Sequence, residues 1–124
     1  MSYTISYQAD TARVDYAGET TVEEIKDAHS EISEDMRFYE CHHLILDVRD
    51  CNLSGVSVPE LSSVVVSDLW ASRRNKSLKV AFLIQSLVNM ERTSEFINES
   101  RISPWEWRQF ESEERAMDWF RAEA

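Results

Sequence analysis

Apolar and polar residues along the chain repeat with two different periods, and each period predicts its own kind of element. Residues 3–8 and 11–16 alternate with a period of two, which is typical of strands with one buried face, and the short QADT segment between them suits a hairpin turn. Continuous apolar runs at 44–48 and 78–84 predict strands that are buried on both faces. The WEWRQF segment at 105–110 predicts a last strand.

Helical spacing of apolar residues predicts helices between and after these strands. The first spans about 22–38, and a weaker one spans about 88–101. Between them, Ser57-Val58-Pro59-Glu60 has the form of a capping box with proline in the first turn, and the helix that it opens extends to about Asn75. Ser112 caps the last helix. The residues expected to face the core from the first and third helices are Val22, Ile25, Ala28, Ile32, Met36, Met90, Thr93 and Ile97.

The predicted order of elements is therefore β-β-α-β-α-β-α-β-α, and the 124 residues have the length of a single domain, 1–124. Strands that alternate with helices imply a mostly parallel sheet with right-handed crossovers. We predict an α/β fold in which helices cover one mixed, mostly parallel sheet of about five strands. The opening hairpin forms its antiparallel edge.

The charge balance and the scarcity of glycine exclude several classes of function. Thirteen Lys and Arg against 23 Asp and Glu give a net charge of −10, so the average field repels nucleic acids and anionic bilayers. Gly18 and Gly55 are the only glycines and lie far apart, so the chain has no glycine-rich phosphate cradle. We therefore expect neither a nucleic-acid partner nor a cofactor.

The compartment follows from what the chain lacks. No apolar run approaches the roughly 18 residues of a membrane span, and the first residues do not have the pattern of a signal peptide. Cys41 and Cys51 flank the predicted strand at 44–48, which would hold them on the order of 20 Å apart, too far for a disulfide. Reduced thiols suit the cytoplasm, so we expect a cytoplasmic protein without integral membrane association.

Four features together resemble the SpoIIAA-like branch of the STAS superfamily. They are the order of elements, the LILDV strand with an acid near its end, the serine-bearing loop before the second helix, and the final WRQFESEERAMDWF segment. The resemblance covers nearly the whole chain, and it implies the fold predicted above and a bacterial regulatory role. The branch is also similar in fold to lipid-transfer domains of the CRAL-TRIO type.

The resemblance also implies where a regulatory serine would lie. In anti-sigma-factor antagonists of the superfamily, a serine at the start of the helix after this strand is phosphorylated within an Asp-Ser-Ser-Gly type motif. The corresponding segment here, DVRDCNLSGVSVPEL, has Ser54-Gly55 and Ser57 but lacks that motif. What the resemblance implies most directly is therefore partner binding.

Polar residues after the third predicted strand form a candidate ligand or phosphoacceptor loop. Asp47, Asp50, Ser54 and Ser57 follow the apolar run, at the carboxyl end of the sheet where ligands bind in open parallel folds. The alternative is structural, since Asp50 and Ser54 are turn formers and Ser57 is a helix cap. Turn and capping chemistry favours the structural interpretation.

The second predicted helix has more apolar residues than one core stripe requires. Leu61, Val64, Val65 and Leu69 form such a stripe, whereas Val66 and Trp70 form a second ridge about 100° around the helix. Extra apolar width is explained equally by deeper burial and by an interface. STAS domains bind partners through this helix, so the resemblance favours an interface at Val66 and Trp70, and with it a homodimer or another protein partner.

Arg73, Arg74 and Lys76 follow that helix as a cationic cluster. Cations at a helix C-terminus are favoured by the macrodipole, and a site for an acidic partner or a lipid head group is the alternative.

No catalytic or metal constellation is complete. His42 and His43 lie at the opposite end of the sheet from Ser57, so they cannot act as its base. Cys41-His42-His43 has no second cluster to complete a metal shell.

The sequence therefore predicts a non-enzymatic binding module that contacts a protein through its second helix and the preceding loop. The alternative is a small carrier or sensor of an apolar or amphipathic, lipid-like ligand, and the carrier requires an internal cavity.

Overall fold

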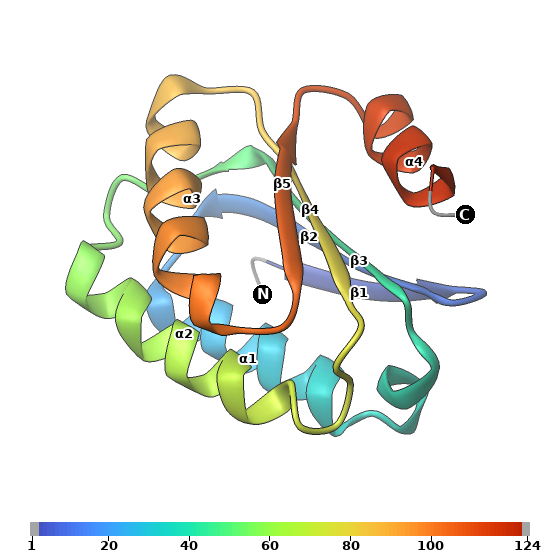
Figure 1. The fold of residues 1–124 in the computed structure, drawn as a ribbon. Coiled ribbons are helices and arrows are strands. Elements are labelled where there is room, and N and C mark those ends of the chain that lie inside the picture. The colour runs from blue at the N-terminus through green and yellow to red at the C-terminus, as the bar shows by residue number, and fades with distance from the viewer. Residues whose placement is uncertain (1–2, 123–124) are drawn as a thin grey trace.

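The computed structural model describes residues 3–122. They contain one five-stranded sheet in the order β1-β2-β3-β4-β5 (Figure 1). β1 is antiparallel to β2, and the other neighbouring pairs are parallel. The strands are β1 (Tyr3–Gln8), β2 (Thr11–Glu19), β3 (His43–Asn52), β4 (Lys79–Leu83) and β5 (Glu106–Phe110). The helices are α1 (Val22–Glu34), α2 (Val58–Ala71), α3 (Leu87–Glu99) and α4 (Glu113–Arg121), with short 3₁₀ helices at η1 (Met36–Glu40) and η2 (Ser100–Ile102).

The helices form two unequal layers. The main core lies between one face of the sheet and α1, α2 and α3, whereas α4 packs alone on the other face (Figure 1). The smaller core under α4 contains Ile45, Ala81, Leu83, Ala116 and Phe120. The predicted order of elements and the predicted mixed, mostly parallel sheet are confirmed.

β3 is longer than its apolar run indicates. Its pairing with β2 shifts register between Asp15 and Ala17 and then continues as far as Glu19 opposite Asn52. Asp47, which the sequence placed at the end of this strand, therefore lies in its middle.

Two predicted helix faces need correction. α1 ends at Glu34 because Asp35 adopts an extended backbone and its side chain accepts a hydrogen bond from the Arg37 N–H at 2.9 Å, which begins η1. Met36 is therefore exposed rather than in the core. α3 buries Asn89, Thr93 and Phe96, so Met90 faces outward.

Asn89 closes the carboxyl end of β3. Its Oδ1 accepts from the Leu53 N–H at 3.0 Å, and its Nδ2 donates to the carbonyls of Val48 and Cys51 at 2.8 and 2.9 Å. The side chain is 1% exposed, so water does not compete for these bonds. Asn89 thereby fixes the start of the loop between β3 and α2.

Replacing Asn89 with alanine leaves one donor and two acceptors of the β3 end without their partners. We expect the free energy of unfolding to fall by about 3 kcal/mol in urea titrations. The matched control is Asn98→Ala, an exposed asparagine on the same helix, for which we expect a change within about 0.5 kcal/mol. Equal losses for the two variants would contradict this role.

Candidate functional site

The loop between β3 and α2 is held at both ends and exposed in its middle. Leu53 and Val56 are buried, and the Val56 N–H donates to the Leu53 carbonyl at 3.0 Å. Ser57 and Glu60 form the predicted capping box: the Ser57 Oγ accepts from the Glu60 N–H at 3.3 Å, and a Glu60 carboxylate oxygen accepts from the Ser57 N–H at 2.9 Å. This capping lowers the pKa of Glu60. The loop is therefore an ordered lead into α2.

The structure brings together only part of the predicted ligand loop. Ser54 and Ser57 lie exposed in the loop, and Asp50 lies exposed near the end of β3. The Ser54 N–H donates to the Asn52 side chain at 3.0 Å, so turn chemistry accounts for this segment. Asp47 is not a member of the loop.

Asp47 is instead the centre of an ion network on the α4 face. The Arg13 Nη2 and the Arg49 Nη2 lie 2.8 and 2.7 Å from its Oδ2, and the Arg49 backbone N–H donates to its Oδ1 at 3.0 Å. Burial raises the pKa of Asp47, but the hydrogen bonds and charge of Arg49, together with the charge of Arg13, outweigh it and lower the pKa below its ordinary value. Arg13 also binds Glu113 at 2.8 Å. The network joins β2 and β3 to α4.

The set of α2 residues that face the core differs from the predicted stripe at one position. The buried residues are Leu61, Val64, Val65, Asp68 and Ala71. An aspartate thus occupies the inward position that the sequence analysis gave to Leu69, and Leu69 lies at the solvent boundary.

Asp68 is buried because it meets His29 of α1. Its Oδ1 lies 2.8 Å from the His29 Nδ1, and both side chains are nearly inaccessible. Burial and then the nearby charge of Asp68 raise the pKa of Tyr16 well above its ordinary value. This polar group lies between α1, α2 and β2, and the His29–Asp68 contact joins the two helices.

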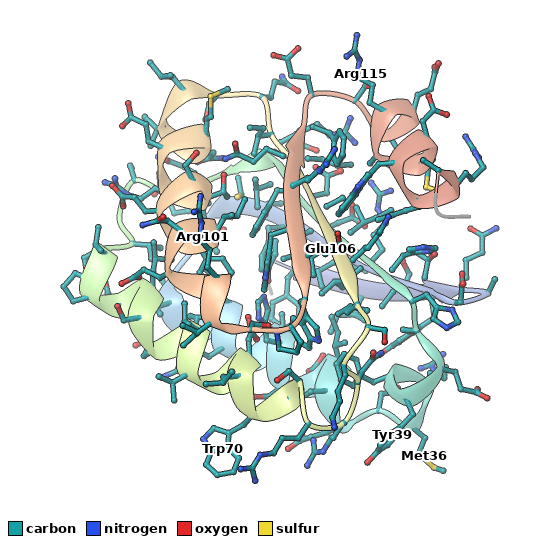
Figure 2. The ribbon with its side chains drawn as sticks, viewed as in Figure 1. Met36, Tyr39, Trp70, Arg101, Glu106 and Arg115 are labelled. Carbon is teal, nitrogen blue, oxygen red and sulfur yellow. The ribbon has the colours of Figure 1, made fainter. Side chains whose placement is uncertain are left out.

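The outward face of α2 carries an exposed apolar ridge. Val66, Leu69 and Trp70 are 56%, 36% and 62% exposed, and the Trp70 side chain projects away from the body of the protein (Figure 2). The sequence analysis left burial and interface as equal alternatives for Val66 and Trp70. The structure excludes burial within the monomer.

The cationic cluster is only partly open. The Arg73 guanidinium lies 4.4 Å from the centre of the Trp70 ring, and the Arg74 Nη1 donates to the Ser33 carbonyl near the end of α1 at 3.0 Å. Lys76 is exposed. Arg74 therefore serves the α1 C-terminus, whereas Arg73 extends the apolar ridge with a positive charge.

The apolar cavity beneath the helices of the main core is too small for the carrier function. It has a volume of about 40 Å³ and lies under α1, α2 and α3, among residues that include Leu46, Phe82 and Phe96. Ligand pockets usually measure about 300–1,000 Å³. The structure thus does not favour a carrier of a lipid-like molecule.

Two other kinds of site are absent from the part of the chain that the structure describes. Among residues 3–122, no three His, Cys, Asp or Glu side chains are placed to hold a metal ion. No helix within the same residues is long and apolar enough to span a membrane.

No family model and no curated protein matches this chain. Two of the solved structures that do match it cover more than nine-tenths of its length. One is the anti-sigma factor antagonist SpoIIAA in its unphosphorylated form, 15% identical, with a TM-score of 0.60 over 96% of this chain and 97% of that one. The other is an uncharacterised DUF3478-family protein with a SpoIIAA-like fold from Shewanella loihica PV-4, 18% identical, with a TM-score of 0.53 over 94% and 90%. The chain therefore has the SpoIIAA-like fold.

The sequence analysis missed Asp68 and Asn89. Each is polar at a position that helical spacing places inside, which is a signal that a search for polar residues within apolar stripes would have found. Their partners, His29 and Leu53, are 39 and 36 residues away and carry no local signal.

Replacing Asp47 with asparagine tests the ion network through its pH dependence. A carboxyl whose folded pKa lies below the unfolded value of about 3.9 stabilises the fold above that pH, and this stabilisation is lost as the pH falls through the folded pKa. We expect Asp47→Asn to cost about 2 kcal/mol at pH 7 and less at pH 3, by urea unfolding.

The control is Asp118→Asn, which removes an exposed ion pair with Arg121 and should cost well under about 1 kcal/mol. If the difference in the free energy of unfolding between the wild type and Asp47→Asn stays constant from pH 7 to pH 3, the charge of Asp47 is not what stabilises the fold.

Proposed function

We propose that this protein is a non-enzymatic regulatory module that binds another protein through α2 and the loop before it. The observation that carries the proposal is the exposed ridge of Val66, Leu69 and Trp70. Large apolar side chains grouped on one helix face are typical of interaction surfaces, and tryptophan and arginine are the residues most enriched at binding hot spots.

The surroundings of the ridge support a binding role over catalysis. The side chains of Asn52 and Ser57 beside the ridge serve a turn and a helix cap, and the His29–Asp68 pair is buried under α2. The fold is shared with an anti-sigma factor antagonist. At 15% identity this likeness supports only the general class of regulatory module.

The charge of the α2 face defines the chemistry of the partner. Within residues 61–76 the only acid is Asp68, which is buried, whereas Arg73 and Lys76 are exposed at the end of the ridge. The rest of this chain is strongly acidic. We infer a partner surface with apolar side chains beside carboxylates, which this face would attract and the remainder of the molecule would repel.

Trp70→Ser tests the proposal, with Ile102→Ser as the matched control because Ile102 is 71% exposed and lies at η2 rather than on α2. Proteins retained from the source cells by the wild type and by both variants are identified, and each candidate is then purified for direct binding by calorimetry. We expect one partner whose Kd is unchanged by Ile102→Ser and raised at least about tenfold by Trp70→Ser.

Folding is checked on the same samples. Because Trp70 is exposed, its substitution should change the free energy of unfolding by no more than about 0.5 kcal/mol. A purified partner that binds the folded Trp70→Ser protein as tightly as the wild type, or the absence of any partner sensitive to this substitution, would refute the proposal. Homodimer formation through the same ridge stays a prediction, which sedimentation of these proteins tests.

A further inference from the structure

β1 leaves one edge of the sheet open. It pairs with β2 on one side and is the terminal strand of the sheet, farthest from β5 (Figure 1). Within the described residues, no backbone group of Tyr3–Gln8 has a hydrogen bond other than those to β2. A strand edge of this kind presents a row of donors and acceptors that another extended chain can satisfy.

The opposite edge of the sheet, at β5, carries features that discourage pairing with a further strand. β5 carries Glu106 and Arg108, follows Pro104, and is tied to α3 where the Gln109 Nε2 donates to the Met90 carbonyl at 2.9 Å. Charges and proline are the usual devices that prevent strand pairing at an edge. β1 has the sequence YTISYQ, with neither charge nor proline. β1 therefore lacks the features that discourage strand pairing at the β5 edge.

An acidic helix flanks the open edge. Tyr3 donates to a Glu31 carboxylate oxygen at 3.2 Å, and burial followed by Glu31, Asp27 and Glu24 raises the pKa of Tyr3. These three acids lie at positions i, i+3 and i+7 of α1, on one face of the helix. A stripe of negative charge therefore follows the edge strand.

A shallow groove runs between the strand and the end of this helix. Its volume is about 280 Å³, and its lining is Ile5, Ser6, Tyr7, Glu31, Asp35 and Arg37. Asp35 is paired with Arg37 at 2.8 Å, and Arg37 lies 3.7 Å from the centre of the Tyr7 ring. The charge of Asp35 is thus neutralised, whereas Asp27 and Glu31 lie near the Tyr3 half of the strand.

We propose that the β1 edge is a docking site for an extended, basic segment of another protein, which adds to the sheet as a sixth strand. Backbone hydrogen bonds to Tyr3–Gln8 would supply affinity, and lysine or arginine at every second position would face the acids of α1. A second copy of this chain is disfavoured, because pairing β1 with β1 would bring two acidic α1 helices together. This surface is separate from the α2 ridge, so it goes beyond the function proposed above.

The probe is an eight-residue peptide in which lysine alternates with threonine and valine, KTKVKTKV, titrated into isotope-labelled protein and followed by nuclear magnetic resonance. We expect chemical-shift changes and slowed amide exchange confined to Tyr3–Gln8 and the facing side of α1. Binding should weaken as salt rises from about 50 to about 300 mM. The control peptide KPKPKPKP has the same charge but cannot pair as a strand, and it should bind at least about fivefold more weakly.

Matched protein variants separate local charge from the overall field. Asp27→Asn with Glu31→Gln should weaken peptide binding roughly fivefold. Glu91→Gln with Glu114→Gln removes the same charge from exposed positions on α3 and α4 and should have less than about a twofold effect.

Four outcomes overturn the proposal: no binding, protection elsewhere in the protein, equal binding of the two peptides, or equal effects of the two double variants. Concentration-dependent protection of β1 without peptide would overturn it too, because it would assign the edge to a second copy of the chain. None of these results depends on Trp70, so they leave the proposed function of α2 untouched.

Discussion

The contact between His29 and Asp68 supports the rotation of α2 that leaves its apolar ridge facing the solvent. A buried carboxylate is costly unless it is paired, and Asp68, turned inward with Leu61, Val64 and Val65, meets the His29 Nδ1 at 2.8 Å through its Oδ1. At 100° per residue, this choice directs Leu69 and Trp70 away from the core. Turning the helix by one residue would bury Leu69 and leave the histidine without its partner. The rotation that buries Leu61, Val64 and Val65 is thus the one that pairs Asp68 with His29 and exposes the ridge.

The sequence pattern predicted correctly those elements that form through interactions between neighbouring residues. The capping box at Ser57 and Glu60 and the buried strands β3 and β4 need only a few neighbouring residues to form. The extension of β3 to Asn52, by contrast, depends on β2 continuing past its register shift near Asp15. Asp47 accordingly changed from a residue of the candidate loop to the centre of an ion network. Its partner Arg13 is 34 residues away and could not be found by spacing.

In the candidate site, too, sequence spacing predicted the local features and missed the contacts between distant residues. Sequence spacing identified Val66 and Trp70 as surplus to one core stripe, and the structure shows both exposed. It could not show that Arg74 is bound to the end of α1, because that contact joins the turn after α2 to the carbonyl of Ser33. An amphipathic pattern tells how much of a helix is apolar, whereas long-range polar contacts decide which part faces inward.

The net charge of −10 is distributed unevenly, so the β1 edge and the exposed face of α2 differ in the sign of their local charge. α1 has five acids, among them Asp27 and Glu31, which flank the open β1 edge. The exposed face of α2 has none between Leu61 and Lys76 and ends in Arg73. A basic extended segment suits the first surface, and an apolar surface with carboxylates suits the second. Such a division would let one small domain contact two partners without competition between them.

Hydroxyl-radical footprinting in intact source cells, compared with the purified protein, tests the central claim most directly. Trp70 is the most exposed tryptophan among the described residues, and Ile102, also exposed but away from α2, serves as the internal reference. The account predicts that Trp70 is labelled strongly in the purified protein and protected in cells, while Ile102 is labelled equally in both. Equal labelling of Trp70 in the two samples would contradict it.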